Sequence, residues 1–169
     1  MHPRRSATAA AVRTEPSREP ATDDAHRYTA ELETQLGYLL RRAQLAVFAD
    51  FSASQPGPVT RPGQFSVLFV IGRHPGLSQT QLCDALGIKR ANLVAVLDQF
   101  ESLGLARRES SADDRRANRL YLTAAGEKAL EQAVDAQREH EARLTRLLGA
   151  SGRRDLIALL AGLCALGSG

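Results

Sequence analysis

The sequence predicts a mainly α-helical fold: a winged helix-turn-helix flanked by long N- and C-terminal helices, whose spare apolar surface indicates a subunit interface or an internal cavity. Three observations predict it. Residues 78–103 have the pattern of a short helix, a tight turn and a second helix. Two short runs with alternating apolar residues then enclose a charged segment, as in a β-hairpin. Long helical patterns on either side carry more apolar surface than a chain of 169 residues buries by itself.

Composition sets broad limits on function. Apolar residues make up 43% of the chain, which is enough for one domain with a core. A net charge of +3 and a pI of about 9.2 suit a nucleic-acid partner without requiring one. There is no apolar run long enough for a membrane span, and the N-terminus lacks the pattern of a signal peptide. We therefore expect a cytoplasmic protein.

Residues 1–25 are expected to form a disordered tail, because they are polar and have no apolar period. A DNA-contacting arm is the alternative, although acidic residues counter its arginines. Residues 26–169 are expected to form a single domain. Its first helix, from Tyr28 to about Phe51, belongs to a dimerisation segment at about residues 27–53. Apolar residues lie on several sides of this helix, which indicates a subunit interface or an internal cavity. The main stripe consists of Leu32, Leu36, Leu39, Ala43 and Val47.

The predicted DNA-binding winged helix spans about residues 60–122. Pro62 marks the start of a helix that ends at residues 74–76. Ser78 and Gln81 form a capping box at the start of the short helix, and Gly87 ends it. The second helix runs from Arg90 to about Leu103. Its expected core face consists of Leu93, Val96, Leu97, Phe100 and Leu103.

Two short strands are expected next, at residues 105–109 and 119–122, with the polar segment 110–118 as the wing between them. Thr123 caps a long helix that runs to about Leu148. Gly126 lies in its first turn, where a side chain would clash with packed backbone. Residues 149–152 break this helix, and a leucine-rich helix follows. Residues 124–167 form the second part of the dimerisation region.

This order of elements resembles the MarR family of bacterial transcription regulators from about Tyr28 to Leu166. The specific signature is Asp-x-Arg, five residues, and Leu-Thr, which is present here at Asp114 to Thr123. The resemblance implies a homodimer that binds a pseudo-palindromic operator, with the second helix in the major groove and the wing in the flanking minor groove. It also implies a repressor that a small aromatic or acidic effector releases from DNA.

The predicted contacts to double-stranded DNA are Ser78, Gln79, Lys89, Arg90, Asn92, Val94, Ala95, Arg107, Arg115 and Arg116. Arg90 and Asn92 have the side chains that bond guanine and adenine edges, and Lys89 suits a phosphate. Family members commonly carry polar or basic residues at the positions of Val94 and Ala95, so here these residues either touch thymine methyl groups or pack.

Ser78 and Gln79 lie at a helix N-terminus that suits a phosphate, although capping alone also explains Ser78. In the wing, Asp114 is expected to pair with Arg116 and hold the hairpin, while Arg115 enters the minor groove. The two arginines could also exchange these roles. Arg107 and Arg108 either assist DNA binding or are ordinary surface residues.

The resemblance also implies an effector pocket walled by the first two helices. Its candidate residues are Tyr38, Arg41, Arg42, Phe48, Phe65, Phe69 and His74. An apolar pocket with an arginine suits an aromatic carboxylate or an acyl-CoA thioester. Core packing is an alternative for each aromatic residue, and dimer-interface pairing is an alternative for the two arginines.

Three other classes of function are weaker. Redox sensing would need a reactive thiol, but Cys83 and Cys164 are expected to be buried and inert. No metal-ligand spacing, cofactor-binding motif or nucleophile motif indicates an enzyme, and no cofactor is expected. A dimeric interaction module without DNA binding is the remaining alternative, which the intact wing signature disfavours.

Overall fold

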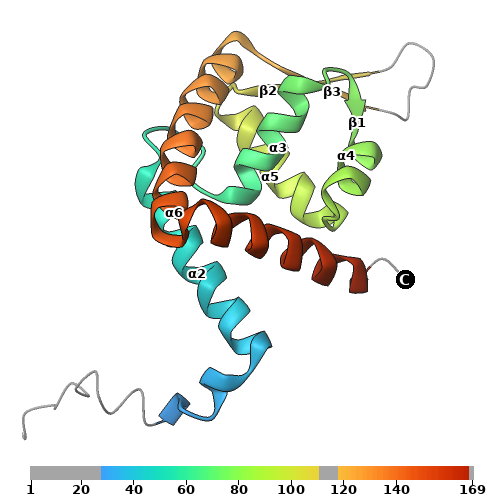
Figure 1. Cartoon of the computed structure of the whole chain (residues 1–169). Coiled ribbons are helices and arrows are strands. Elements are labelled where there is room, and N and C mark those ends of the chain that lie inside the picture. The colour runs from blue at the N-terminus through green and yellow to red at the C-terminus, as the bar shows by residue number, and fades with distance from the viewer. Residues whose placement is uncertain (1–27, 111–117, 168–169) are drawn as a thin grey trace, which may run out of the picture. The chain divides into compact units, whose positions relative to one another are not determined.

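The computed structural model describes residues 28–110 and 118–167 (Figure 1). The predicted tail at residues 1–25 and the centre of the wing lie outside the described residues. The chain divides into two compact units, residues 1–42 and 43–169, and the boundary falls within helix α2 (Leu36–Ser54). The two units are described separately.

In the first unit, the expected continuous helix from Tyr28 is wrong. A 3-10 turn, η1 (Leu32–Thr34), is followed by Gln35 in an extended conformation, and α2 begins only at Leu36. The Thr34 hydroxyl donates to the Glu31 carbonyl at 2.9 Å, a local bond of the kind that competes with a regular helix.

α2 extends through Ser54, three residues beyond the expected end at Phe51. The hydroxyl groups of Ser52 and Ser54 donate to carbonyls one turn earlier, at 2.8 and 2.6 Å. The predicted apolar stripe is open, since Leu36 is 59% exposed and Leu39 is 46% exposed.

The second unit contains the predicted helix-turn-helix. α3 (Pro62–Arg73) begins with its proline, as expected. α4 (Gln79–Leu86) begins at the predicted capping box, in which Gln81 N donates to the Ser78 hydroxyl at 3.2 Å and Ser78 N donates to the Gln81 side chain at 2.9 Å. Gly87 ends α4 with a φ of 61°, and α5 (Arg90–Ser102) follows after two further residues.

A three-stranded antiparallel sheet supports the wing. β2 (Ala106–Ser110) and β3 (Asn118–Leu122) are the two predicted strands, and each lies within one residue of its expected position. A third strand, β1 (Leu77–Ser78), was not expected. It pairs with β3, so the strand order is β1-β3-β2. The start of α4 is therefore attached directly to the wing.

The core lies between α3, α4, α5 and the sheet (Figure 1). Most of the expected core face of α5 is confirmed, because Leu93, Leu97 and Phe100 are fully buried. Leu103 is the exception and is 47% exposed. The helix ends at Ser102, so Leu103 belongs to the turn that leads into Gly104, which has a φ of 66°.

α6 (Ala124–Cys164) begins at the predicted cap, where Gly126 N donates to the Thr123 hydroxyl at 3.1 Å. Its first half packs on α3 through small buried residues such as Ala129 and Ala133. A non-helical Gly149, with φ 70° and ψ 159°, produces the predicted break as a kink within one long helix. A short 3-10 turn, η2 (Ala165–Gly167), follows.

The part of α6 beyond the kink leaves its leucine-rich surface open, with Leu159 68% exposed. Cys164 is also exposed, so the expectation that it is buried is wrong, whereas Cys83 is half-buried and packs against the core. Across residues 28–110 and 118–167, no helix is both long and apolar enough to cross a membrane.

Candidate DNA interface and effector cavity

The N-terminal part of α5 presents polar side chains outward. Lys89, Arg90 and Asn92 are exposed, while Leu93 and Leu97 on the other side of the helix are fully buried. Among the described residues, no hydrogen bond or ion pair uses the side chains of Lys89, Arg90 or Asn92. Burial of the apolar face therefore fixes α5 and leaves these donors available to a partner.

The two unusual apolar positions of α5 differ in burial. Val94 is half-buried and Ala95 is exposed. Ala95 also lines a cavity, described below, together with Val96 and Gln99 of the same helix. Packing against the protein thus explains the apolar side chain of Val94 in part. Ala95 lies where α5 meets this cavity.

Ser78 and Gln79 lie at the N-terminus of α4. Both are half-buried, and Ser78 performs the capping role that was the alternative to a phosphate contact. The Ser78 backbone also pairs with Arg119 in the β1–β3 ladder. Capping and a phosphate contact do not exclude each other, because the hydroxyl group that accepts from Gln81 can still donate.

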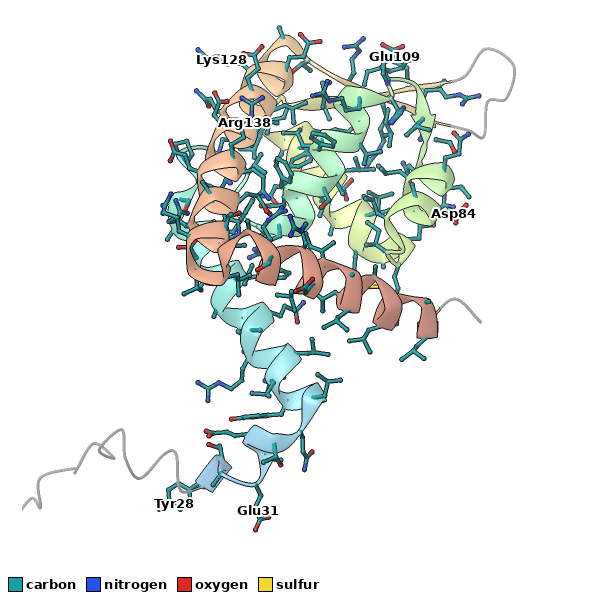
Figure 2. The ribbon with its side chains drawn as sticks, viewed as in Figure 1. Tyr28, Glu31, Asp84, Glu109, Lys128 and Arg138 are labelled. Carbon is teal, nitrogen blue, oxygen red and sulfur yellow. The ribbon has the colours of Figure 1, made fainter. Side chains whose placement is uncertain are left out.

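At the base of the wing, Arg107 is held by three neighbours. Its Nε bonds Glu109, which is labelled in Figure 2, at 2.6 Å. One Nη donates to the Leu122 carbonyl at 3.0 Å, and the guanidinium lies 5.2 Å from the centre of the Tyr121 ring. These contacts join β2 to β3. They favour a structural role for Arg107, although its side chain is 51% exposed.

Arg108 joins the wing to α5. Its two Nη atoms bond Glu101 and Asp98, both at 2.8 Å, and its backbone N donates to Glu101 at 3.1 Å. Its side chain is only 21% exposed. Two roles were expected for Arg108, a DNA contact or an ordinary surface position. This geometry favours neither of them. Arg108 sets the position of β2 relative to α5.

The wing-tip residues Asp114, Arg115 and Arg116 lie outside the described residues. Thr123, the predicted structural residue at the other end of the wing, caps α6 and also donates from its hydroxyl to the Gly104 carbonyl at 2.5 Å. The wing is therefore tied at its base to the turn after α5 and to α6.

A largely apolar cavity of about 530 Å³ lies between the second half of α2, the start of α3 and the middle of α5. It is lined by Phe48, Ala49, Ser52, Arg61, Pro62, Gly63, Gln64, Ala95, Val96 and Gln99. One of the predicted effector residues, Phe48, is in this lining and is 42% exposed.

The other predicted effector residues of the second unit lie elsewhere. Phe65 and Phe69 form an aromatic row with Phe51, with ring centres 6.0 and 5.6 Å apart, and are not part of the lining. His74 is exposed at the end of α3. These positions favour the alternative of core packing for Phe65, which packs against the core, while the half-buried Phe69 lies beside Phe65 and Arg73.

Tyr38, Arg41 and Arg42 belong to the first unit, where all three lie on α2. The Arg42 guanidinium lies 5.9 Å from the centre of the Tyr38 ring. Their assignment to an effector site stays a prediction.

The four polar residues of the cavity, Ser52, Arg61, Gln64 and Gln99, were not expected from the sequence. Arg61 is exposed and precedes the first turn of α3, where the free amides of the helix favour a negative charge. Gln64 is only 4% exposed, and its Oε1 accepts from the backbone N of Thr60 and Arg61 at 3.1 and 3.0 Å. The sequence signal beside them is the Thr-Arg-Pro helix start, which predicts a helix boundary and no ligand site.

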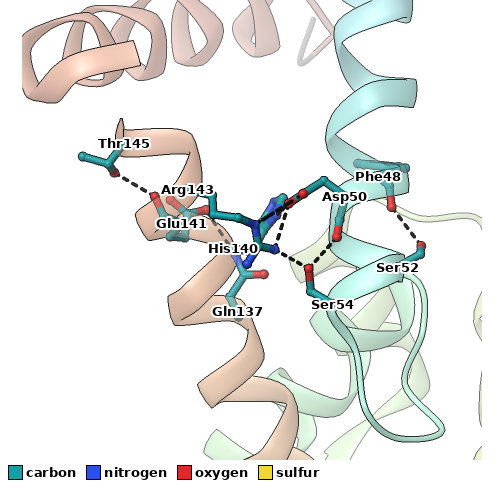
Figure 3. A network of polar contacts seen from close by, with 9 residues as sticks. All are labelled: Phe48, Asp50, Ser52, Ser54, Gln137, His140, Glu141, Arg143 and Thr145. Carbon is teal, nitrogen blue, oxygen red and sulfur yellow. Dashed lines mark hydrogen bonds and ion pairs between the residues drawn. The ribbon is translucent and has the colours of Figure 1, made fainter. Parts of the chain in front are cut away.

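A polar network joins α2 to α6 within the second unit (Figure 3). Asp50 lies 2.6 Å from Nδ1 of the buried His140 and accepts from Arg143 at 2.9 Å, and Arg143 also bonds Ser54. The Arg143 guanidinium, and then the bond to His140, hold the pKa of the Asp50 carboxyl below its usual value. The ring of Phe51 packs edge-on against His140, with 5.7 Å between the ring centres.

A second, more polar cavity of about 850 Å³ lies beside the wing base, between α3, the sheet and α6. Arg73, Arg107 and Arg138 line it together with Glu127 and Glu131, so charges of both signs are present. Within residues 28–110 and 118–167, no three His, Cys, Asp or Glu side chains converge as a metal site would require.

Comparison with known proteins identifies the family. The family model of the MarR family matches residues 58–117. A protein of Thauera aromatica, named as a transcriptional regulatory protein for the hcr operon, is 34% identical over 143 residues, which cover 83% of this chain and 86% of that protein. The chain belongs to the MarR family. A MarR-family protein is a transcription regulator and not an enzyme.

Solved structures of a second relative extend the comparison. The transcriptional repressor CouR, bound to a 23-mer DNA duplex, is 44% identical with a TM-score of 0.74, covering 80% of this chain and 96% of the CouR chain. CouR bound to p-coumaroyl-CoA is 41% identical with a TM-score of 0.73, covering 79% and 94%. The winged helix-turn-helix predicted from the sequence is thus the fold of this MarR-family chain.

Proposed function

We propose that this MarR-family protein is a ligand-responsive repressor. It binds a pseudo-palindromic operator as a homodimer and is released by a small aromatic acid or its CoA thioester. One observation carries the proposal: the same helix, α5, presents Lys89, Arg90 and Asn92 outward at its start and lines an apolar cavity at its middle. A ligand in the cavity would therefore touch the helix expected to read DNA.

DNA binding is assigned first to α5. Arg90 and Asn92 would contact base edges in the major groove, and Lys89 would contact a phosphate. Arg115 or Arg116 would enter the minor groove from the wing, while Arg107 and Arg108 hold the wing at its base. The structure of CouR bound to a DNA duplex, at 44% identity, supports DNA binding by this chain.

The homodimer is assigned to residues 27–53 and 124–167. Within the second unit, exposed apolar residues gather on α6 beyond the kink, where Ile157 and Leu159 are 49% and 68% exposed. An apolar surface of this kind in a transcription regulator is characteristic of a subunit interface. A second copy of the chain would cover it.

The effector is assigned to the cavity of about 530 Å³, a volume within the usual range for small-molecule sites. Phe48, Pro62 and Val96 offer apolar contacts for an aromatic ring. Arg61 and the start of α3 offer a positive environment for a carboxylate or a thioester carbonyl. The nucleotide part of a CoA thioester would extend outside the cavity. CouR bound to p-coumaroyl-CoA supports this class of ligand.

A mobility-shift assay with the promoter region of the protein's own gene tests the proposal. We expect a discrete complex that p-coumarate or p-coumaroyl-CoA dissociates. To act as a switch, the effector must weaken DNA binding by about 5- to 150-fold. Arg61→Gln should lower effector sensitivity and leave DNA binding unchanged. A protein that binds neither this DNA nor other promoter fragments would contradict the proposal.

A further inference from the structure

The side-chain amide of Gln64 has one possible orientation. Its Oε1 accepts two backbone N–H groups at the start of α3, from Thr60 and Arg61, so the Nε2 must be the group that faces the other way. That Nε2 donates to Oε1 of Gln99 on α5 at 2.8 Å. The bond joins residues 35 positions apart and links the start of α3 to the recognition helix.

Gln64 needs an acceptor for this donor. The residue is only 4% exposed, and a buried N–H group without a partner is strongly disfavoured. Gln99 is exposed and can move without leaving its own polar groups unsolvated. The two ends of the bond are therefore unequal: Gln64 requires the contact, whereas Gln99 can exchange it for water.

Both residues line the cavity. Gln99 follows Ala95 by four positions and Val96 by three, so all three side chains lie on the same side of α5. A molecule in the cavity would lie beside the Gln64–Gln99 bond and against the face of α5 that contains Gln99.

We propose that the effector acts by acceptor exchange at Gln64. Without effector, Gln99 supplies the acceptor for Gln64 Nε2, and the bond holds α5 in its DNA-binding position. A carboxylate or thioester oxygen in the cavity takes over the Gln64 donor, so Gln64 stays satisfied and α5 loses this hydrogen bond to α3, while the packing of its buried face remains. This inference rests on the proposed function and specifies its ligand: the effector must present a hydrogen-bond acceptor beside Gln64.

Gln99→Leu tests the exchange with a readout that a merely structural role would not move. Without the Gln99 acceptor, the effector can bind the Gln64 amide without displacing a competing side chain. The DNA-free protein should therefore bind p-coumaroyl-CoA about fivefold more tightly, the factor that corresponds to one typical net hydrogen bond. Operator affinity without effector should fall by about the same factor, because α5 is no longer tied. A variant that was simply less well folded would bind both partners more weakly.

Two further variants complete the experiment. Gln99→Glu keeps an acceptor and makes the bond to Gln64 charge-assisted, so p-coumaroyl-CoA should bind more weakly. Release of the DNA should then require a higher concentration of p-coumaroyl-CoA. Gln55→Leu replaces a half-buried glutamine after α2 that lies outside the cavity lining, the predicted DNA contacts and the dimerisation segments, so both affinities should equal those of the wild type. Calorimetric titration gives the effector affinity, and fluorescence anisotropy with labelled promoter DNA gives the operator affinity.

The outcomes distinguish a failure of the acceptor exchange at Gln64 from a failure of the proposed function. If wild-type protein binds the DNA and p-coumaroyl-CoA releases it, the proposed function stands, and Gln99→Leu then decides the exchange. Unchanged or weaker effector binding by Gln99→Leu would overturn the exchange alone, the weaker binding marking Gln99 as a direct ligand contact. No release of wild-type protein by p-coumaroyl-CoA or p-coumarate would overturn the effector assignment and the exchange with it.

Discussion

Gly126→Ala should destabilise the protein because α6 begins in close contact with the start of the wing. A Cβ at this position would overlap the Leu105 carbonyl oxygen and lie 2.9 Å from the carbonyl carbon. The obstacle is backbone, which cannot rotate away as a side chain can. The same Leu105 carbonyl accepts a hydrogen bond from Thr123 N at 3.0 Å, so moving it would also weaken that bond.

The expected loss in the free energy of unfolding has three contributions. Overpacking in a close-packed region costs about 1–3 kcal/mol. Weakening the Thr123–Leu105 bond costs up to about 1 kcal/mol. The better helix propensity of alanine recovers at most about 1 kcal/mol, and less than that in the first turn. We therefore expect the free energy of unfolding to fall by about 1–3 kcal/mol, or about 4–8 °C in Tm for a loss of 2 kcal/mol.

Urea denaturation followed by circular dichroism measures this loss, at one fixed protein concentration because a dimer's stability depends on concentration. Gly63→Ala, in the first turn of α3, is the matched control. No atom lies within 4 Å of its added methyl group, so this variant should be as stable as the wild type or more stable, by up to about 1 kcal/mol. Equal effects of the two substitutions would refute the packing argument.

Three other substitutions probe separate parts of the molecule. Ser78→Ala should cost about 1 kcal/mol of stability by removing the α4 cap. Operator affinity, measured well below the melting temperature, distinguishes the two roles of Ser78. It should be unchanged if Ser78 is only a cap and weaker if Ser78 also contacts a phosphate. Asp50 has a depressed pKa in the folded protein, so its contribution to stability is present above its ordinary pKa and is lost as pH falls through the folded value. In Asp50→Asn, urea midpoints should therefore fall less steeply below about pH 4 than in the wild type, and an identical slope would show that Arg143 and His140 do not stabilise the carboxylate. Arg115→Ala should weaken operator binding and reduce the salt dependence by about one counterion, whereas an unchanged affinity across a salt titration would remove Arg115 from the DNA contacts.

Local signals explain which parts of the fold could be predicted from the sequence. The Ser78–Gln81 capping box, the turn at Gly87 and the cap at Thr123 each depend on residues within four positions of one another, and all three are present in the structure. The space restriction at Gly126 was also expected, from its place in the first turn.

Features that depend on distant partners could not be predicted. Strand β1 has only two residues and forms because β3 offers an edge beside Leu77. The Asp50–His140 contact spans 90 positions, and nothing near either residue indicates it. The polar cavity residues Arg61 and Gln64 were missed for a related reason. Arg61 belongs to a helix start, which by itself indicates no ligand site, and a buried glutamine gains its role only from the helix packed against it.

Sequence-specific binding of the protein to its own promoter is the most direct test of the account. Fluorescence anisotropy at physiological salt should compare a labelled promoter fragment with an unrelated fragment of equal length. We predict that the promoter is bound at least about 10³-fold more tightly, the lower end of the usual range for specific DNA-binding proteins. Equal affinity for the two fragments would contradict the assignment of α5 as a sequence-reading helix.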